Sequence, residues 1–183
     1  MLKTLLALSV AAGLTVVFAL PAQASDGTIN FVGAIKDVTC TVQAAGTSGI
    51  STVTLPTITK SALTTVGATA GDTNFNIELT NCSGTDVSGS GVAVHFEPGV
   101  NVNANGRLTN NGAATGVDLA LYETNAASPL NLGVAPTAAY KSMTGATPNG
   151  SATLPYTVKY YATSATPGAG TVTSSVVYSV VYF

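Results

Sequence analysis

The stretch GTVTSSVVYSVVYF, residues 170–183, decides how the rest of the chain is interpreted. Its even-numbered positions, which we call the first parity, carry the apolar residues Val172, Val176, Tyr178, Val180 and Tyr182. Period-2 alternation in a segment rich in β-branched and aromatic residues predicts a strand with one face in a core. The other parity is partly apolar as well, through Val177, Val181 and Phe183, so we expect both faces of this strand to be covered.

No residue follows Phe183, so this strand has no downstream hairpin partner. An unpaired strand edge presents free backbone N–H and C=O groups. We therefore expect one edge of the terminal strand to be paired by an earlier segment or by another chain.

Residues 1–24 have the pattern of a targeting segment. Lys3 supplies a positive charge, residues 5–20 form an apolar run, and Ala22-Gln23-Ala24 is a small-residue cleavage site. The alternative is a membrane anchor, but the run is shorter than the roughly 20 residues that a spanning helix needs. We expect a signal peptide that is removed, leaving a chain that begins at Ser25.

The composition favours pleated strands over helices, and it does not indicate nucleic-acid binding. Only 8% of residues are charged and Trp is absent. The six basic residues include Lys3 of the leader, and they stand against eight acidic residues. This charge imbalance is small and scattered, and it does not indicate a nucleic-acid partner. We therefore expect partners to bind through backbone and apolar contacts.

Two cysteines, Cys40 and Cys82, agree with export. An exported chain with two thiols most simply pairs them, so we expect a structural disulfide. The chain has no C-x-x-C motif, and His95 is its lone histidine. Redox and metal roles are therefore not expected, and no cofactor is predicted.

The segment SDGTINFVGAIKDVTCTV, residues 25–42, can be extended with one apolar face. Gly27, Ile29, Phe31, Gly33 and Ile35 share one parity. One interpretation is an ordinary first strand. The other is a detachable arm, residues 25–35, followed by the first strand of a domain that spans residues 36–183. Glycines weaken a strand unless another backbone approaches closely.

Further alternating segments predict a single all-β sandwich. Strands are expected around Phe75, Ile77 and Leu79, around Val92, Val94 and Phe96, around Val117, Leu119 and Leu121, and around Leu154, Tyr156, Val158 and Tyr160. A short strand is expected at residues 52–55, a possible helical turn at 61–63, a turn at Gly71-Asp72, and a possible short strand at 130–132.

Catalytic constellations are weak. His95 has no second histidine, and Glu97 shares its parity, so no triad order can be proposed. Asp118 lies among alternating hydrophobic residues, which predicts a solvated sheet face for its carboxylate. We expect no enzyme.

The chain resembles the subunits of type 1-like chaperone-usher fimbriae of Gram-negative bacteria over essentially the whole part after the leader. The matching stretches are GTINFVGAIKDVTCTV, LPTITKSAL, FNIELTNC, VHFEPG, VDLALYE, LPYTVKYYAT and GTVTSSVVYSVVYF. Gly170, the fourteenth residue from the end, and Tyr182, the penultimate one, match the terminal signature that this family presents to its chaperone.

The resemblance implies a pilin fold, which is an incomplete immunoglobulin-like sandwich completed by a donor strand. A periplasmic chaperone would first lend a strand beside residues 170–183, and an outer-membrane usher would replace it with the arm of the next copy. Ile29, Phe31 and Ile35 would fill a groove lined by the first-parity residues of the terminal strand, with Gly33 at a shallow place. The other partners implied are identical neighbours and a tip adhesin subunit, in a fimbrium at the cell surface.

Three alternatives remain beside a major shaft subunit. A tip adhesin carries a lectin domain before its pilin domain, and this chain has no room for one. A minor or adaptor subunit would share the same fold. A self-complemented secreted β-sandwich would fold the arm back onto its own groove.

Overall fold

The computed structural model describes residues 27–183, and the predicted leader lies outside them. Contacts between residues group the chain up to Ala34 apart from Ile35–Phe183, which we call the body. Within residues 27–183, no helix combines the length and the hydropathy that a membrane span requires.

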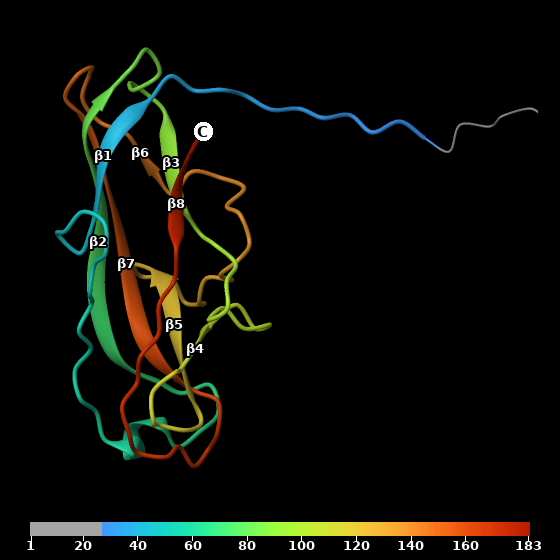
Figure 1. Ribbon diagram of the computed structural model, residues 1–183, viewed down its shortest axis with the longest axis vertical. Helices are drawn as coiled ribbons and strands as arrows, with labels where there is room; N and C mark the ends of the chain where they lie inside the picture. The colour runs from blue at the N-terminus through green and yellow to red at the C-terminus, as the bar shows by residue number, and fades with distance from the viewer. Residues whose placement is uncertain (1–26) are drawn as a thin grey trace, which may run out of the picture. The chain divides into compact units, whose positions relative to one another are not determined.

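Two antiparallel sheets form the body (Figure 1). The larger sheet has the order β1-β2-β7-β5-β4. Its strands are β1 (Thr39–Ala44), β2 (Thr69–Ser83), β7 (Gly150–Ala162), β5 (Val117–Glu123) and β4 (Leu108–Thr109). The smaller sheet has the order β6-β3-β8, with β6 (Lys141–Ser142), β3 (Gly91–Phe96) and β8 (Tyr178–Tyr182). The predicted all-β class is confirmed.

One main core lies between the sheets. Inward side chains of the larger sheet include Ile77, Leu79 and Leu154, and the smaller sheet contributes Val92 and Phe96. These residues are buried because successive side chains of a strand point to opposite faces, so each alternating segment directs one apolar row inward. Burial of this apolar surface is the main driving force for closing the sandwich.

The four strongest strand predictions are confirmed by β2, β3, β5 and β7. The predicted turn at Gly71-Asp72 is wrong, because both residues lie inside β2. The pairing of β2 with β7 shifts between Ala70 and Thr73, so the chain forms a bulge there. Gly71 has a φ of +70°, and a Cβ would lie 2.7 Å from the ring of Tyr160, which explains the glycine.

Three weaker predictions had mixed outcomes. Residues 52–55 and 130–132 form no strand, although Val53, Leu55 and Leu130 pack against the main core. The helical turn is present as η1, a 3-10 helix at Lys60–Leu63. Leu63 is buried there in a small second cluster with Val117 and Ala162.

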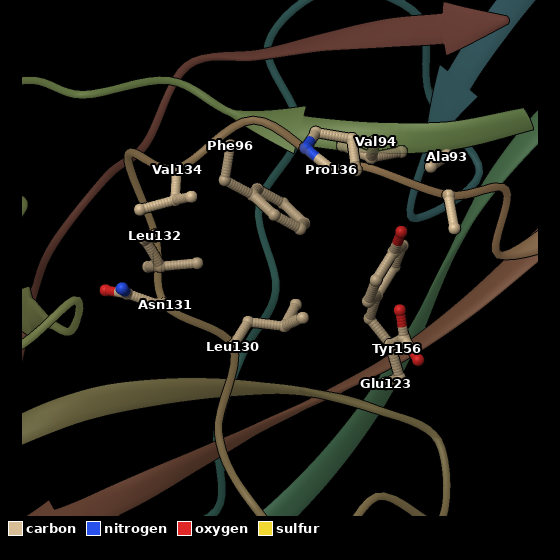
Figure 2. A pocket seen from close by; sticks show the side chains of 11 residues that line it. Ala93, Val94, Phe96, Glu123, Leu130, Asn131, Leu132, Val134, Pro136 and Tyr156 are labelled. Carbon is tan, nitrogen blue, oxygen red and sulfur yellow. The ribbon is translucent and has the colours of Figure 1, made fainter. Parts of the chain in front are cut away.

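A small cavity of about 90 Å³ adjoins the core beneath residues 130–138. Figure 2 shows the rings of Phe96 and Tyr156 and the side chains of Leu130 and Leu132 pointing into the same space. Glu123 supplies the charged group of this largely apolar lining. The cavity therefore has the character of a packing defect at the edge of the core.

Candidate functional site

The terminal segment packs one face against the core, as its alternation predicts. Val172, Val176, Tyr178, Val180 and Tyr182, which we call the C-terminal strip, are all partly buried against the main core. The residues between them from Thr171 to Ser179 are exposed, apart from Ser174. The strip therefore presents apolar side chains that are neither fully buried nor free in solvent.

The prediction of one continuous strand over residues 170–183 is wrong for its first half. Only Tyr178–Tyr182 forms a strand, and it pairs with β3. Before Tyr178 the chain runs along the loop between β4 and β5, where Asn111 N donates to Thr173 O and Ala114 N donates to Thr171 O. Such scattered bonds hold the segment extended without building a ladder.

The expected cover on both faces also fails at Val177, whose side chain is 72% exposed. Val181 and Phe183 on the same parity are partly buried. The outer face of the terminal segment is thus open near Val177 and partly covered near its end.

Each of the two sheets ends in an edge strand that bears partly buried apolar side chains. Among residues 27–183, β8 pairs only with β3, and β1 pairs only with β2. Apart from Ala44, which forms a bridge with Thr47, backbone groups on the outer edges of β1 and β8 have no strand neighbour in the described part of the chain. An edge of this kind is a template for another strand.

A second row of partly buried apolar side chains accompanies β1. Val38 immediately precedes β1, and Val42 lies within it. Val53 and Leu55 come from the extended segment that follows. We call these four residues the N-terminal rim. The rim and the C-terminal strip pack against the same core. Sequence analysis did not assign the rim to a site, although the alternation of Val53 and Leu55 was a usable signal.

The disulfide between Cys40 and Cys82 is present, with an S–S distance of 2.04 Å. It joins β1 to the end of β2, and Cys82 is fully buried in the main core. The expected pairing is therefore confirmed. In the chain-entropy account, closing a loop of this length stabilises the fold by about 4 kcal/mol.

Gly170 begins the terminal segment and has a structural reason to be glycine. A Cβ at this position would overlap the backbone of Ala113 and Ala114. Thr171 lies equally close to Gly112, where a Cβ would overlap the carbonyl oxygen of Thr171. Gly170 therefore permits the terminal segment to lie against this loop, whatever its role toward a chaperone.

The predicted arm exposes its large apolar side chains. Ile29 is 78%, Phe31 90% and Ile35 100% exposed. At Gly33 a Cβ would meet no atom within 4 Å. Val32, on the other parity, is exposed as well, so the described structure does not distinguish the two faces of the arm. The donor role of Gly27, Ile29, Phe31, Gly33 and Ile35 stays a prediction.

Polar clusters on the body are structural in geometry. His95 Nδ1 lies 3.2 Å from Glu97 Oε2, and Ser179 Oγ donates to Glu97 Oε1 at 2.5 Å. Because the carboxylate lies between the hydroxyl and the imidazole, His95 cannot take a proton directly from Ser179. Within residues 27–183, no group of three or more potential metal ligands is present.

The expected solvated position of Asp118 is wrong. Asp118 is buried, and its Oδ2 accepts hydrogen bonds from Arg107 Nε at 3.1 Å and from Asn103 Nδ2 at 3.0 Å. The guanidinium of Arg107 also lies 4.1 Å from the centre of the Tyr161 ring. These partners satisfy the buried carboxylate, so Asp118 anchors the 103–107 turn to β5.

Burial also changes the acidity of phenols in and beside the site. Desolvation raises the pKa of Tyr182, the last residue of the C-terminal strip, and it raises the pKa of Tyr156 in the core further. Both phenols therefore resist ionisation at alkaline pH more than a free tyrosine does.

Comparisons with known proteins agree on one family. The profile of FimA, type-1 fimbrial protein A, matches residues 55–183. The major fimbrial subunit SMF-1 of Stenotrophomonas maltophilia is 45% identical over 172 residues, which cover 89% of this chain and 96% of that protein. The F17 fimbrial protein of Escherichia coli is 36% identical over 163 residues, covering 87% and 88% respectively.

Among solved structures, the P pilus rod subunit PapA superposes with a TM-score of 0.57 at 18% identity, over 78% of this chain and 99% of that chain. A chaperone-usher pilus structure gives a TM-score of 0.56 at 21% identity, over 90% and 100%. At these identities the likeness establishes the fold alone, which is that of a pilin.

Proposed function

Because the chain belongs to the type-1 fimbrial protein family, as the matches over residues 55–183 show, we propose that its copies join by donor-strand exchange. The chain is a structural subunit of a pilus and belongs to a non-enzymatic class. In the proposed exchange, the arm of one copy covers the C-terminal strip and the N-terminal rim of the next.

The incomplete cover of these two rows of apolar side chains, which we call the open side of the core, is the observation that carries this proposal. The C-terminal strip and the N-terminal rim leave apolar side chains half-covered, and β8 has a backbone edge without a strand neighbour in residues 27–183. Addition of a strand would pair the backbone edge through ladder hydrogen bonds and would cover the apolar side chains with its own side chains. Donor-strand complementation of pilins is an established case of this mode.

The arm has the chemistry of such a donor. Ile29, Phe31 and Ile35 share one parity, so in an extended strand all three project to the same side. Burying each of these exposed side chains contributes roughly 1.5 to 3 kcal/mol. Added to ladder hydrogen bonds, this supports a long-lived non-covalent polymer.

Before assembly the open side needs a temporary occupant, because an exposed apolar edge promotes aggregation. We assign this role to a periplasmic chaperone that lends a strand, followed by an outer-membrane usher that exchanges it for an arm. A tip adhesin subunit at the end of the fibre completes the set of partners. The same route takes the chain through the periplasm to the cell surface.

Gly33→Asn tests the arm. A side chain at residue 33 disturbs nothing within the subunit, since a Cβ there has no neighbour within 4 Å, but it would obstruct entry into a shallow part of the acceptor. We expect loss of surface fibres, seen by electron microscopy, with the chaperone complex still recovered from the periplasm.

Val32→Asn is the matched control, because it places the same side chain on the opposite parity. It should give fibres in normal amount. Normal fibres from the Gly33→Asn variant would contradict the proposed pairing. A purified chain that remains a folded monomer without any chaperone would favour self-complementation instead.

A further inference from the structure

The root of the arm is held by a reciprocal set of hydrogen bonds. The backbone N of Asp37 donates to Asp86 Oδ2 at 2.9 Å, and the backbone N of Asp86 donates to Asp37 O at 3.2 Å. Thr85 donates twice to Asp37 Oδ2, from its backbone N at 3.0 Å and from Oγ1 at 3.1 Å. Four bonds thus join one residue of the chain before β1 to two consecutive residues of the loop after β2.

Close packing supports these bonds. Gly84 has a φ of +122°, and a Cβ there would overlap the carbonyl group of Asp37. Thr147 Oγ1 donates to Gly84 O at 2.5 Å, and Ser90 Oγ donates to Asp86 O, so the loop is itself fixed from its far side. We call Asp37, Gly84, Thr85 and Asp86 the root clamp.

The root clamp lies a short distance along the chain from two other ties. Thr39 is paired with Ser83, and Cys40 is bonded to Cys82. These ties already hold β1 to β2, so the clamp is not needed to build the sheet. What the clamp adds is control of Asp37, which comes just before the part of the chain that these ties and the core already hold.

We propose that the root clamp sets the direction in which the arm leaves the body, and thereby the angle between consecutive copies in the fibre. The inference rests on the proposed function, because only an arm inserted in a neighbour transmits this direction. With the clamp closed, free rotation of the arm begins at Lys36. With it open, the φ and ψ angles of Asp37 also become free, which widens the range of directions.

The rate of trypsin cleavage after Lys36 measures how often the clamp opens. Lys36 is exposed, and the bond that trypsin would cut joins it to Asp37, whose N–H is held by Asp86. A protease needs the chain around the cleaved bond to open locally. Asp86→Ala removes the carboxylate that accepts from Asp37 N and leaves the residues beside the cleaved bond unchanged, so we expect about fivefold faster cleavage after Lys36 in the full chain isolated from the periplasm.

Cleavage after Lys60, in η1, is the internal reference and should keep its rate. Asp72→Ala is the matched control, because Asp72 is another exposed carboxylate of the body, paired with Lys159 at 2.8 Å and distant in sequence from the arm. It should leave cleavage after Lys36 unchanged. Thr85→Val removes only the Oγ1 bond and gives a smaller increase, and it replaces Asp86→Ala if that variant fails to accumulate.

Electron microscopy of fibres measures the expected effect on the angle between consecutive subunits. We expect the root-clamp variants to form fibres with a broader distribution of angles between consecutive subunits than wild type and Asp72→Ala. Fibres with an unchanged angular distribution, or an unchanged cleavage rate after Lys36, would overturn the inference. Failure of the proposed function would instead be seen as normal fibres from Gly33→Asn, and the trypsin measurement does not depend on assembly.

Discussion

Tyr156 shows how one side chain couples the core to pH. Its ring is buried against Phe75, at 5.8 Å between ring centres, and edge-on against Phe96 at 5.2 Å. Burial raises the pKa of its phenol well above the ordinary value of 10.0. A group whose folded pKa is raised contributes stability that is complete below the unfolded pKa and is lost as pH rises above it.

Tyr156→Phe is therefore expected to reduce the alkaline sensitivity of the protein. Above pH 10, each ionised phenol that folding must neutralise lowers the free energy of unfolding by about 1.4 kcal/mol per pH unit. The phenylalanine keeps the ring contacts, so the variant should lose less stability than wild type between pH 9 and 11. Thermal unfolding across that range checks this, and parallel curves for the two proteins would contradict it.

Single residues were also where sequence reasoning was least secure. Asp118 was expected in solvent because its neighbours alternate, yet Arg107 and Asn103 reach it from a separate turn. Gly71 was expected to make a turn, yet it sits in a bulge against Tyr160. Both outcomes depend on contacts between distant segments, which a local pattern does not contain.

At the scale of the element, the two faces of the terminal segment differ in burial. Val180 lies on the C-terminal strip and packs on the core, whereas Val177 is exposed on the other parity. Val180→Asn should therefore lower the free energy of unfolding by about 1 to 2 kcal/mol and reduce fibre yield. Val177→Asn should change stability by less than about 0.5 kcal/mol.

Chemical denaturation and fibre yield measured on the pair would check this, and equal effects of the two substitutions would contradict the assignment of faces. Alternation predicted the strip correctly because period 2 is a local property of the chain. It overestimated the length of the strand, because residues 171–177 lie beside a loop that offers only isolated backbone bonds, such as the one from Ala114 N to Thr171 O.

At the scale of the whole molecule, the all-β class and the disulfide could be predicted from residues alone. The missing strand could be inferred only in part from residues 170–183, because their alternation predicts a strand without saying what pairs with its second edge, and the resemblance supplied the rest. The N-terminal rim was not predicted as a site, because the alternation of Val53 and Leu55 indicates a buried face but not that these residues lie beside β1 without forming a strand. The root clamp is likewise visible only in three dimensions, since Asp37 and Asp86 are 49 residues apart.

The most direct test of the central claim uses a chain without its arm and a synthetic peptide of residues 25–35. We predict that the peptide raises the thermal unfolding midpoint of the chain 36–183 in a saturable manner, and that a peptide carrying Gly33→Asn raises it much less. If the chain 36–183 alone unfolds at the same midpoint with and without the peptide, its sandwich is already complete and the account is contradicted.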